Sequence, residues 1–88
     1  MTYEVIFSDK AIRQLKKMEK TVQERIIATL ERIRIRPEKY VTKLVGDPGY
    51  KLRVGDHRII MDIDNKNLHI MEVFFRGVES HELDGNWE

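Results

Sequence analysis

Two alternating stretches joined by a Gly-Asp pair constrain the fold of this chain more than any other feature. Residues 51–54 and 57–63 alternate between polar and apolar side chains over most of their length, as half-buried β-strands do. Gly55 and Asp56 between them are typical of a tight hairpin turn. A third alternating stretch, 67–75, follows after a short polar turn. The sequence therefore predicts a three-stranded antiparallel meander.

Four cations converge if this meander forms. Lys51 and Arg53 share one face of the first strand, Arg58 follows the turn, and Arg76 ends the third strand. Such a cluster repels itself unless an anion lies among its members. Arginine binds phosphate and carboxylate through paired hydrogen bonds. We therefore expect a local anion site on these strands.

The first part of the chain predicts one more strand and a first helix. Residues 2–7 alternate, with Tyr3 and Val5 on one side. Ser8 follows as an N-cap, and apolar residues at helical spacing continue to about Met18.

The second helix is expected to begin at a capping box. Thr21 and Glu24 stand at the spacing at which each side chain satisfies a free backbone N–H group of the other. Pro37 disfavours helical backbone at Arg36, so the helix should end near there. The element order, β-α-α-β-β-β, predicts an α+β fold in which a helical hairpin covers one face of the sheet.

Composition limits the class of protein. The chain has 88 residues, so we expect one domain spanning 1–88. It has no cysteine, and its three histidines are too widely spaced for a ligand pair, so no metal or cofactor is expected. No apolar run approaches the roughly 20 residues that span a bilayer, and no signal peptide is evident, so we expect a cytoplasmic protein without membrane contact.

The charge distribution indicates a local anion site instead of a broad basic surface. Residues 1–44 contain 11 Lys or Arg and 6 Asp or Glu, whereas residues 45–88 contain 5 and 9. The predicted cation cluster therefore lies in the acidic half of a chain whose net charge is only +1.

The chain resembles the RelE/ParE toxin superfamily, and specifically its RelE-like ribonuclease branch. The resemblance covers nearly the whole chain. It rests on the opening strand and helical hairpin, on Leu44 to Gly46, on KLRVGDHRIIMDI at 51–63, and on Phe74-Phe75-Arg76. The block at 51–63 is its most specific part.

This resemblance implies a toxin of a type II toxin–antitoxin system. The implied activity is that of a metal-independent endoribonuclease, an mRNA interferase, which cleaves messenger RNA in the ribosomal A site and inhibits translation. The implied partners are a cognate antitoxin, the ribosome and mRNA, and the resemblance also allows a higher-order toxin–antitoxin complex.

The resemblance assigns roles to the four cations. Arg58 and Arg76 are expected to stabilise the phosphorane formed during RNA cleavage, because a guanidinium group can hold two phosphate oxygens. Lys51 and Arg53 are expected to position the RNA backbone, and Lys51 is also a candidate general base.

The resemblance also draws attention to two histidines. His57 stands where many relatives have tyrosine and is expected to contact RNA. His81 stands near the C-terminus, where active relatives have tyrosine or histidine, and is the first candidate for proton transfer.

Structural roles compete with these functional ones. Lys51 and Arg53 could decorate a solvated strand, and His57 could pack beside Ile59. Arg58 could pair with Asp62, and Arg76 with Glu72 or Glu79. Phe74 and Phe75 could stack an RNA base, but alternation favours burying at least one of them.

Two other functions remain open at this level. A ParE-like poison of DNA gyrase would share the fold without cutting RNA. A catalytically inactive relative would retain antitoxin binding and lack proton transfer, since no tyrosine follows Tyr50.

Overall fold

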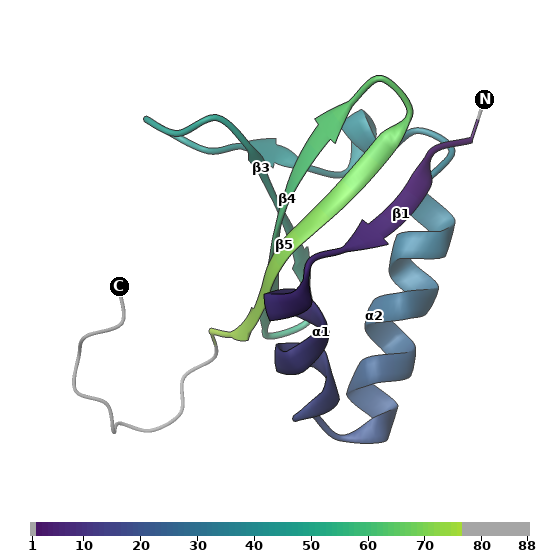
Figure 1. Ribbon diagram of the computed structural model, residues 1–88, viewed down its shortest axis with the longest axis vertical. Helices are drawn as coiled ribbons and strands as arrows, with labels where there is room; N and C mark the ends of the chain where they lie inside the picture. The colour runs from purple at the N-terminus through teal and green to yellow at the C-terminus, as the bar shows by residue number, and fades with distance from the viewer. Residues whose placement is uncertain (1, 77–88) are drawn as a thin grey trace.

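A five-stranded mixed sheet with two helices on one side forms the protein (Figure 1). The structure is a computed structural model and describes residues 2–76. Its elements are β1 (Glu4–Phe7), α1 (Asp9–Lys16), α2 (Lys20–Ile33), a 3-10 helix (Pro37–Lys39), β2 (Thr42–Lys43), β3 (Tyr50–Val54), β4 (His57–Asp64) and β5 (Asn67–Phe75). The predicted α+β fold is confirmed, and β2 adds a short strand that the sequence did not predict.

The pairing of strands confirms the meander and gives β1 its partner. The sheet order is β1-β5-β4-β3-β2, and every pair is antiparallel except β1 with β5. In that parallel pair Phe7 lies opposite Ile70. Parallel strands need a long crossover connection, which the helical hairpin begins.

One hydrophobic core fills the space between the helices and the sheet. Its twelve buried residues are Ala11, Leu15, Ile26, Leu30, Ile33, Leu52, Val54, Ile59, Met61, Leu68, Ile70 and Val73. The helical members recur at spacings of three and four residues, whereas the apolar residues Ile12 and Ile27 beside them are exposed. Among residues 2–76 no polar or charged residue is buried.

The start of α2 differs from the prediction, and the capping box at Thr21 is wrong. The N-cap is Glu19, whose side chain makes no capping bond. The backbone carbonyl of Glu19 accepts the N–H of Gln23 at 3.0 Å, so Thr21 already lies inside the first turn. The side-chain amide of Gln23 also donates to the carbonyl of Met18 at 2.8 Å. The short connection between the helices therefore places the start of α2 earlier than the box requires.

Strand β5 contains a bulge that simple alternation does not predict. The neighbours Ile60 and Met61 on β4 pair with Glu72 and Ile70, which leaves Met71 as an extra residue. The extra residue shifts the alternation of β5 by one position beyond this point.

The bulge determines where the two phenylalanines lie. Phe74 pairs with Arg58 on the sheet face away from the helices and is half-buried, and Phe75 is 42% exposed. The prediction that alternation buries at least one of them in the core is wrong. The bulge moves Phe74 to the other face, and Phe75, which shares the face of Val73, lies at the end of the strand, where solvent reaches it.

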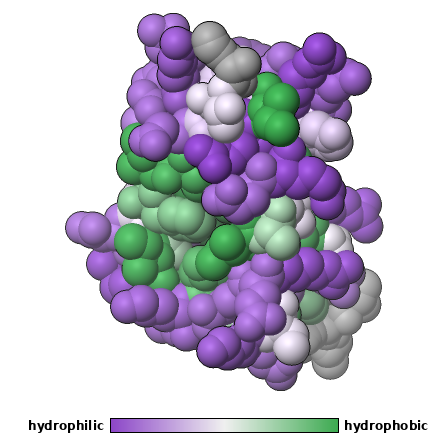
Figure 2. Space-filling view, turned by 90° about the vertical axis from the view of Figure 1, so that its right-hand side faces the viewer, coloured by the Kyte–Doolittle hydropathy of each residue, from purple (hydrophilic) through white to green (hydrophobic). Residues whose placement is uncertain are grey.

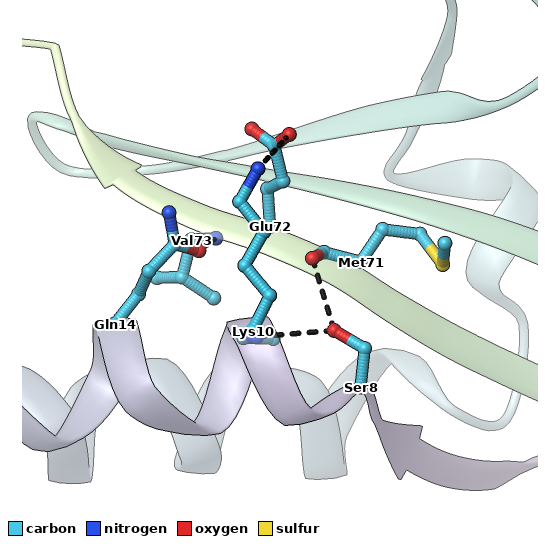
Figure 3. A network of polar contacts seen from close by, with 7 residues as sticks. Ser8, Lys10, Gln14, Met71, Glu72 and Val73 are labelled. Atoms are coloured by element: carbon cyan, nitrogen blue, oxygen red, sulfur yellow. Dashed lines mark hydrogen bonds and ion pairs between the residues drawn. The ribbon is translucent and has the colours of Figure 1, made fainter.

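Side chains from α1 and from its N-cap residue replace the missing strand neighbour of β5. β1 ends at Phe7, and beyond that point the edge of β5 would expose unpaired backbone groups. Ser8, confirmed as the N-cap of α1, donates its hydroxyl to the carbonyl of Met71 at 3.0 Å. Gln14 Oε1 accepts the N–H of Val73 at 2.7 Å. Figure 3 shows these side chains reaching from the helix to the strand.

We expect Gln14→Met to lower the free energy of unfolding by about 1–3 kcal/mol, because it leaves the N–H of Val73 without its acceptor. Val73 is 1% exposed, so water cannot readily take over that bond. Gln14→Glu retains an acceptor oxygen and should remain closer to the wild type. Urea denaturation measures all three proteins. Equal losses in both variants would show that the hydrogen bond contributes little.

Candidate functional site

An open cleft on the sheet face away from the helices contains three of the predicted cations. It has a volume of about 280 Å³ and is lined by Tyr40, Thr42, Lys51, Arg53 and Arg58. We call it the sheet cleft. No carboxylate is among these lining residues, so their charges make the cleft strongly cationic.

The ladder between β3 and β4 positions these cations. Arg53 lies directly opposite Arg58, and Lys51 lies two residues away on the same face of β3. Directly opposed side chains have Cβ atoms only about 4.5–5.5 Å apart, and like charges at this distance destabilise a sheet. A bound anion would remove that repulsion, which favours a binding role over a purely structural one.

The turn between β3 and β4 brings Arg76 to the neighbouring corner. Gly55 has φ 62°, a left-handed conformation that glycine adopts without strain. The carbonyl of Asp56 accepts the N–H of Arg76 at 2.7 Å. The exposed Arg76 therefore lies next to the turn, beyond the residues that line the sheet cleft.

The ion pairs considered for Arg58 and Arg76 do not form among residues 2–76. The pairs that do form there are Lys10–Glu72, Arg34–Glu31 and His69–Asp64. Glu72 is bound by Lys10 at 2.9 Å (Figure 3). Asp62 is not within ion-pair distance of Arg58, so that guanidinium group is available to an external anion. Glu79, the other partner considered for Arg76, lies outside the described residues.

Comparison with protein families gives one decisive match. The model of the ParE toxin of the type II toxin–antitoxin system parDE matches residues 5–77. The chain belongs to this toxin family. The predicted membership of the RelE/ParE superfamily is thereby confirmed.

Solved structures of related toxins share the fold. The RelBE2 toxin–antitoxin complex of Mycobacterium tuberculosis matches with a TM-score of 0.81 and 21% identity, covering 86% of this chain and all of that one. The E. coli RelBE complex matches with a TM-score of 0.67 and 28% identity, covering 85% and 96%. A RelE–RelB complex of Pyrococcus horikoshii matches with 0.71 and 25%, covering 89% and 99%. No curated protein sequence matches the toxin.

His57 lies on the opposite face of the toxin's sheet from the cleft cations. It is in register with Val54 and Phe75, and its ring packs edge-on against Phe75 with centroids 5.2 Å apart. Burial lowers the pKa of His57 below 6.5; nearby Asp56 raises this pKa and Arg25 lowers it. The structure thus agrees with a packing role, and RNA contact by His57 stays a prediction.

We expect the toxin's stability to depend on the protonation of His57. Because folding lowers its pKa, the unfolded chain binds the proton more tightly. The contribution of neutral His57 to the free energy of unfolding is therefore complete above about pH 6.5. This contribution is lost as the pH falls toward the lowered native pKa. Urea denaturation of the wild type and His57→Gln between about pH 8 and pH 5 measures this contribution. Parallel pH profiles for the two proteins would rule it out.

Sequence reasoning missed two residues of the sheet cleft. Tyr40 and Thr42 lie between the predicted second helix and the predicted meander, where the sequence predicted no helix or strand. Thr42 pairs with Lys51 across β2 and β3, and the preceding 3-10 helix brings Tyr40 to the same place. Tyr40 is 48% exposed, which suits a ring that stacks on a base. An isolated aromatic residue in a polar segment was the available signal.

Three further expectations from the sequence concern His81, metal binding and membrane-spanning helices. His81 lies outside the described residues. Within residues 2–76, no three potential ligand side chains come together as a metal site. No helix of that range has the length and apolar character needed to cross a membrane.

Proposed function

We propose that this toxin is a ribosome-dependent endoribonuclease that cleaves messenger RNA in the A site and stops translation. One observation carries the proposal: Lys51, Arg53 and Arg58 line one open cleft, and none of its lining residues in the described part of the chain is acidic. A ribonuclease needs such a cluster to hold a phosphodiester and stabilise its transition state. The 28% identity with the toxin in the E. coli RelBE complex supports the same reading.

The cleavage requires the 2′-oxygen to attack the adjacent phosphorus while the bond to the 5′-oxygen breaks. The products are a 2′,3′-cyclic phosphate and a 5′-hydroxyl. Arg58 holds the non-bridging oxygens, on which charge increases, and Arg76 assists from the neighbouring turn. Arg53 positions the RNA backbone. Lys51 in its neutral form takes the proton of the 2′-hydroxyl, and His81 donates a proton to the leaving 5′-oxygen.

Primer-extension mapping of a defined message in a reconstituted translation system tests this function. We expect wild-type toxin to cut at A-site codons, with no cuts when ribosomes are omitted. Arg76→Ala should weaken the cuts at the same positions. Intact message in the presence of folded toxin and translating ribosomes would contradict the proposal.

The family match gives a reason to test a second function. The matching model is that of the ParE toxin, and a ParE-like toxin would poison DNA gyrase. A supercoiling assay with purified gyrase separates the two functions. Inhibition of supercoiling without cleaved message would replace the ribonuclease by the gyrase poison. Failure in both assays, with antitoxin binding retained, would indicate an inactive relative.

We also propose that a cognate antitoxin covers part of this toxin, as in the RelBE complexes to which it is similar. Figure 2 shows a band of apolar surface across the side of the molecule where α2 and β1 lie. Each of these elements has one large, exposed apolar residue, Ile27 on α2 and Ile6 on β1. Exposed apolar surface of this kind is typical of a protein interface.

We expect Ile27→Asp to weaken antitoxin binding at least about tenfold, because a charge would be buried in an apolar contact. Val45→Asp is the matched control, since Val45 is 97% exposed and lies in the loop between β2 and β3. Titration calorimetry with the purified antitoxin measures both variants. Unchanged affinity of Ile27→Asp would place the antitoxin elsewhere.

A further inference from the structure

A second open cleft lies between strand β3 and helix α2, on the helix side of the sheet. Its volume is about 400 Å³, and its lining consists of Arg25, Ala28, Thr29, Arg32, Arg53, Val54 and Gly55. The α2 members recur at spacings of three and four residues, so they form one face of the helix beside its buried stripe. Three of these seven lining residues are arginines and none is acidic. We call it the helix cleft.

Arg25 lies directly against the turn between β3 and β4. A Cβ atom at Gly55 would lie 3.2 Å from Nη1 of Arg25, so the missing side chain allows the guanidinium group to come close. The positive charge of Arg25 is felt by His57, whose pKa it lowers together with the larger effect of burial. The guanidinium group of Arg25 is therefore already positioned beside the β3–β4 turn.

Among residues 2–76, no carboxylate lies within ion-pair distance of the arginines of the helix cleft, which are Arg25, Arg32 and Arg53. Arg53 donates one hydrogen bond, from Nε to the carbonyl of Gly55 at 3.3 Å. Four of its five N–H donors remain for a ligand, because a guanidinium group carries five.

Arg53 connects the helix cleft to the sheet cleft, since it lines both. β2 pairs with β3 only at Tyr50 and Lys51, so within the described range 2–76 the edge of β3 from Leu52 to Val54 has no strand beside it. A chain of anionic groups can therefore cross this open edge at Arg53. On such a path it would meet cations on both sides of the strand.

We propose that the helix cleft binds the phosphate backbone of the same RNA strand that enters the sheet cleft. The strand crosses the open edge of β3 at Arg53, and Arg25 and Arg32 hold phosphates next to the one at the cleavage site. The identity of the strand rests on the proposed function. A polynucleotide fits better than an acidic peptide, because arginine forks match phosphate oxygens and the path crosses both clefts without a large apolar pocket.

Binding of uncleavable 2′-O-methyl RNA, followed by fluorescence anisotropy, tests this path. A dodecamer is long enough to span both clefts, whereas a trinucleotide occupies one. We expect Arg25→Ala/Arg32→Ala to weaken dodecamer binding about tenfold or more and to leave trinucleotide binding at the sheet cleft nearly unchanged. The slope of log Kd against log salt concentration should fall by about 0.7 for each lost phosphate contact.

Two control variants separate the loss of these phosphate contacts from a general loss of positive charge. Arg25→Lys/Arg32→Lys retains the charges and should retain most of the salt dependence. Arg13→Ala removes an exposed arginine from α1 and should leave dodecamer binding unchanged. Thermal denaturation confirms that each variant is folded. Unchanged dodecamer affinity in the double-alanine variant would overturn the path.

The outcomes distinguish this inference from the proposed function. Wild-type toxin that cleaves message while the double-alanine variant binds the dodecamer normally would retain the ribonuclease and remove the path. Loss of dodecamer binding in the variant, with no cleavage by the wild type, would retain the RNA path and remove the ribonuclease. Equally tight binding of a polyglutamate of matched charge would overturn the path and assign the helix cleft to an acidic protein partner.

Discussion

Arg58→Ala is expected to lower the rate of A-site mRNA cleavage by about 10²–10³-fold, the usual effect of removing one preorganised donor to a transition-state oxygen. Arg58 lines the sheet cleft opposite Arg53 and is half-buried. It makes no ion pair within residues 2–76, so its guanidinium group is free to bind the phosphorane. Quantitative primer extension under single-turnover conditions measures the rate.

The same substitution should not destabilise the fold, which makes the activity loss easy to interpret. Removing Arg58 relieves the repulsion from the directly opposed Arg53, so the variant should unfold at the same urea concentration as the wild type or higher. Arg58→Lys retains the charge without the planar fork and should have intermediate activity. Full activity in Arg58→Ala would exclude this residue from the transition state.

Ile26→Ala is expected to lower the free energy of unfolding by about 2–5 kcal/mol, because it leaves a cavity in the single core. Ile26 is fully buried on α2. Ile27, the next residue on the same helix, is 45% exposed. Ile27→Ala makes the same chemical change with the same gain in helix propensity, and its effect should be much smaller. Urea denaturation of both variants gives the difference.

This pair of variants tests where the core lies. Small domains are stable by only about 5–15 kcal/mol, so Ile26→Ala would remove a large share of the total. We expect a correspondingly lower yield of folded protein and lower activity, although α2 and the sheet cleft lie on opposite sides of the sheet. Similar losses for both variants would contradict the placement of the buried stripe.

The sequence alone determined the two helices, four of the five strands and most of the cation cluster. Strict alternation in 51–54 and the Gly-Asp turn specified the β3–β4 hairpin, because side chains repeat every two residues and such turns join antiparallel strands. Once that hairpin exists, Lys51 and Arg53 must share a face. The two helices were also predictable, because apolar residues recur in them with a period of 3.6 residues, which differs clearly from the period of a strand.

The tertiary structure decided the features that depend on residues distant in sequence. β1 became the parallel neighbour of β5 although both helices and strands β2 to β4 separate the two in sequence, and no local pattern encodes that partner. The short loop between the helices moved the start of α2 away from Thr21. The site gained Tyr40 because the pairing of β2 with β3 brought a loop residue beside the cations.

The bulge at Met71 shows most clearly why local patterns fail here. Alternation predicts faces only while the ladder is unbroken, and one extra residue moves every later side chain to the other face. Phe74 therefore joined the face of Arg58 instead of the core. The sequence determined which residues carry charge and which strands they occupy. The tertiary structure determined which of them meet, because pairing between distant strands depends on packing across the whole sheet.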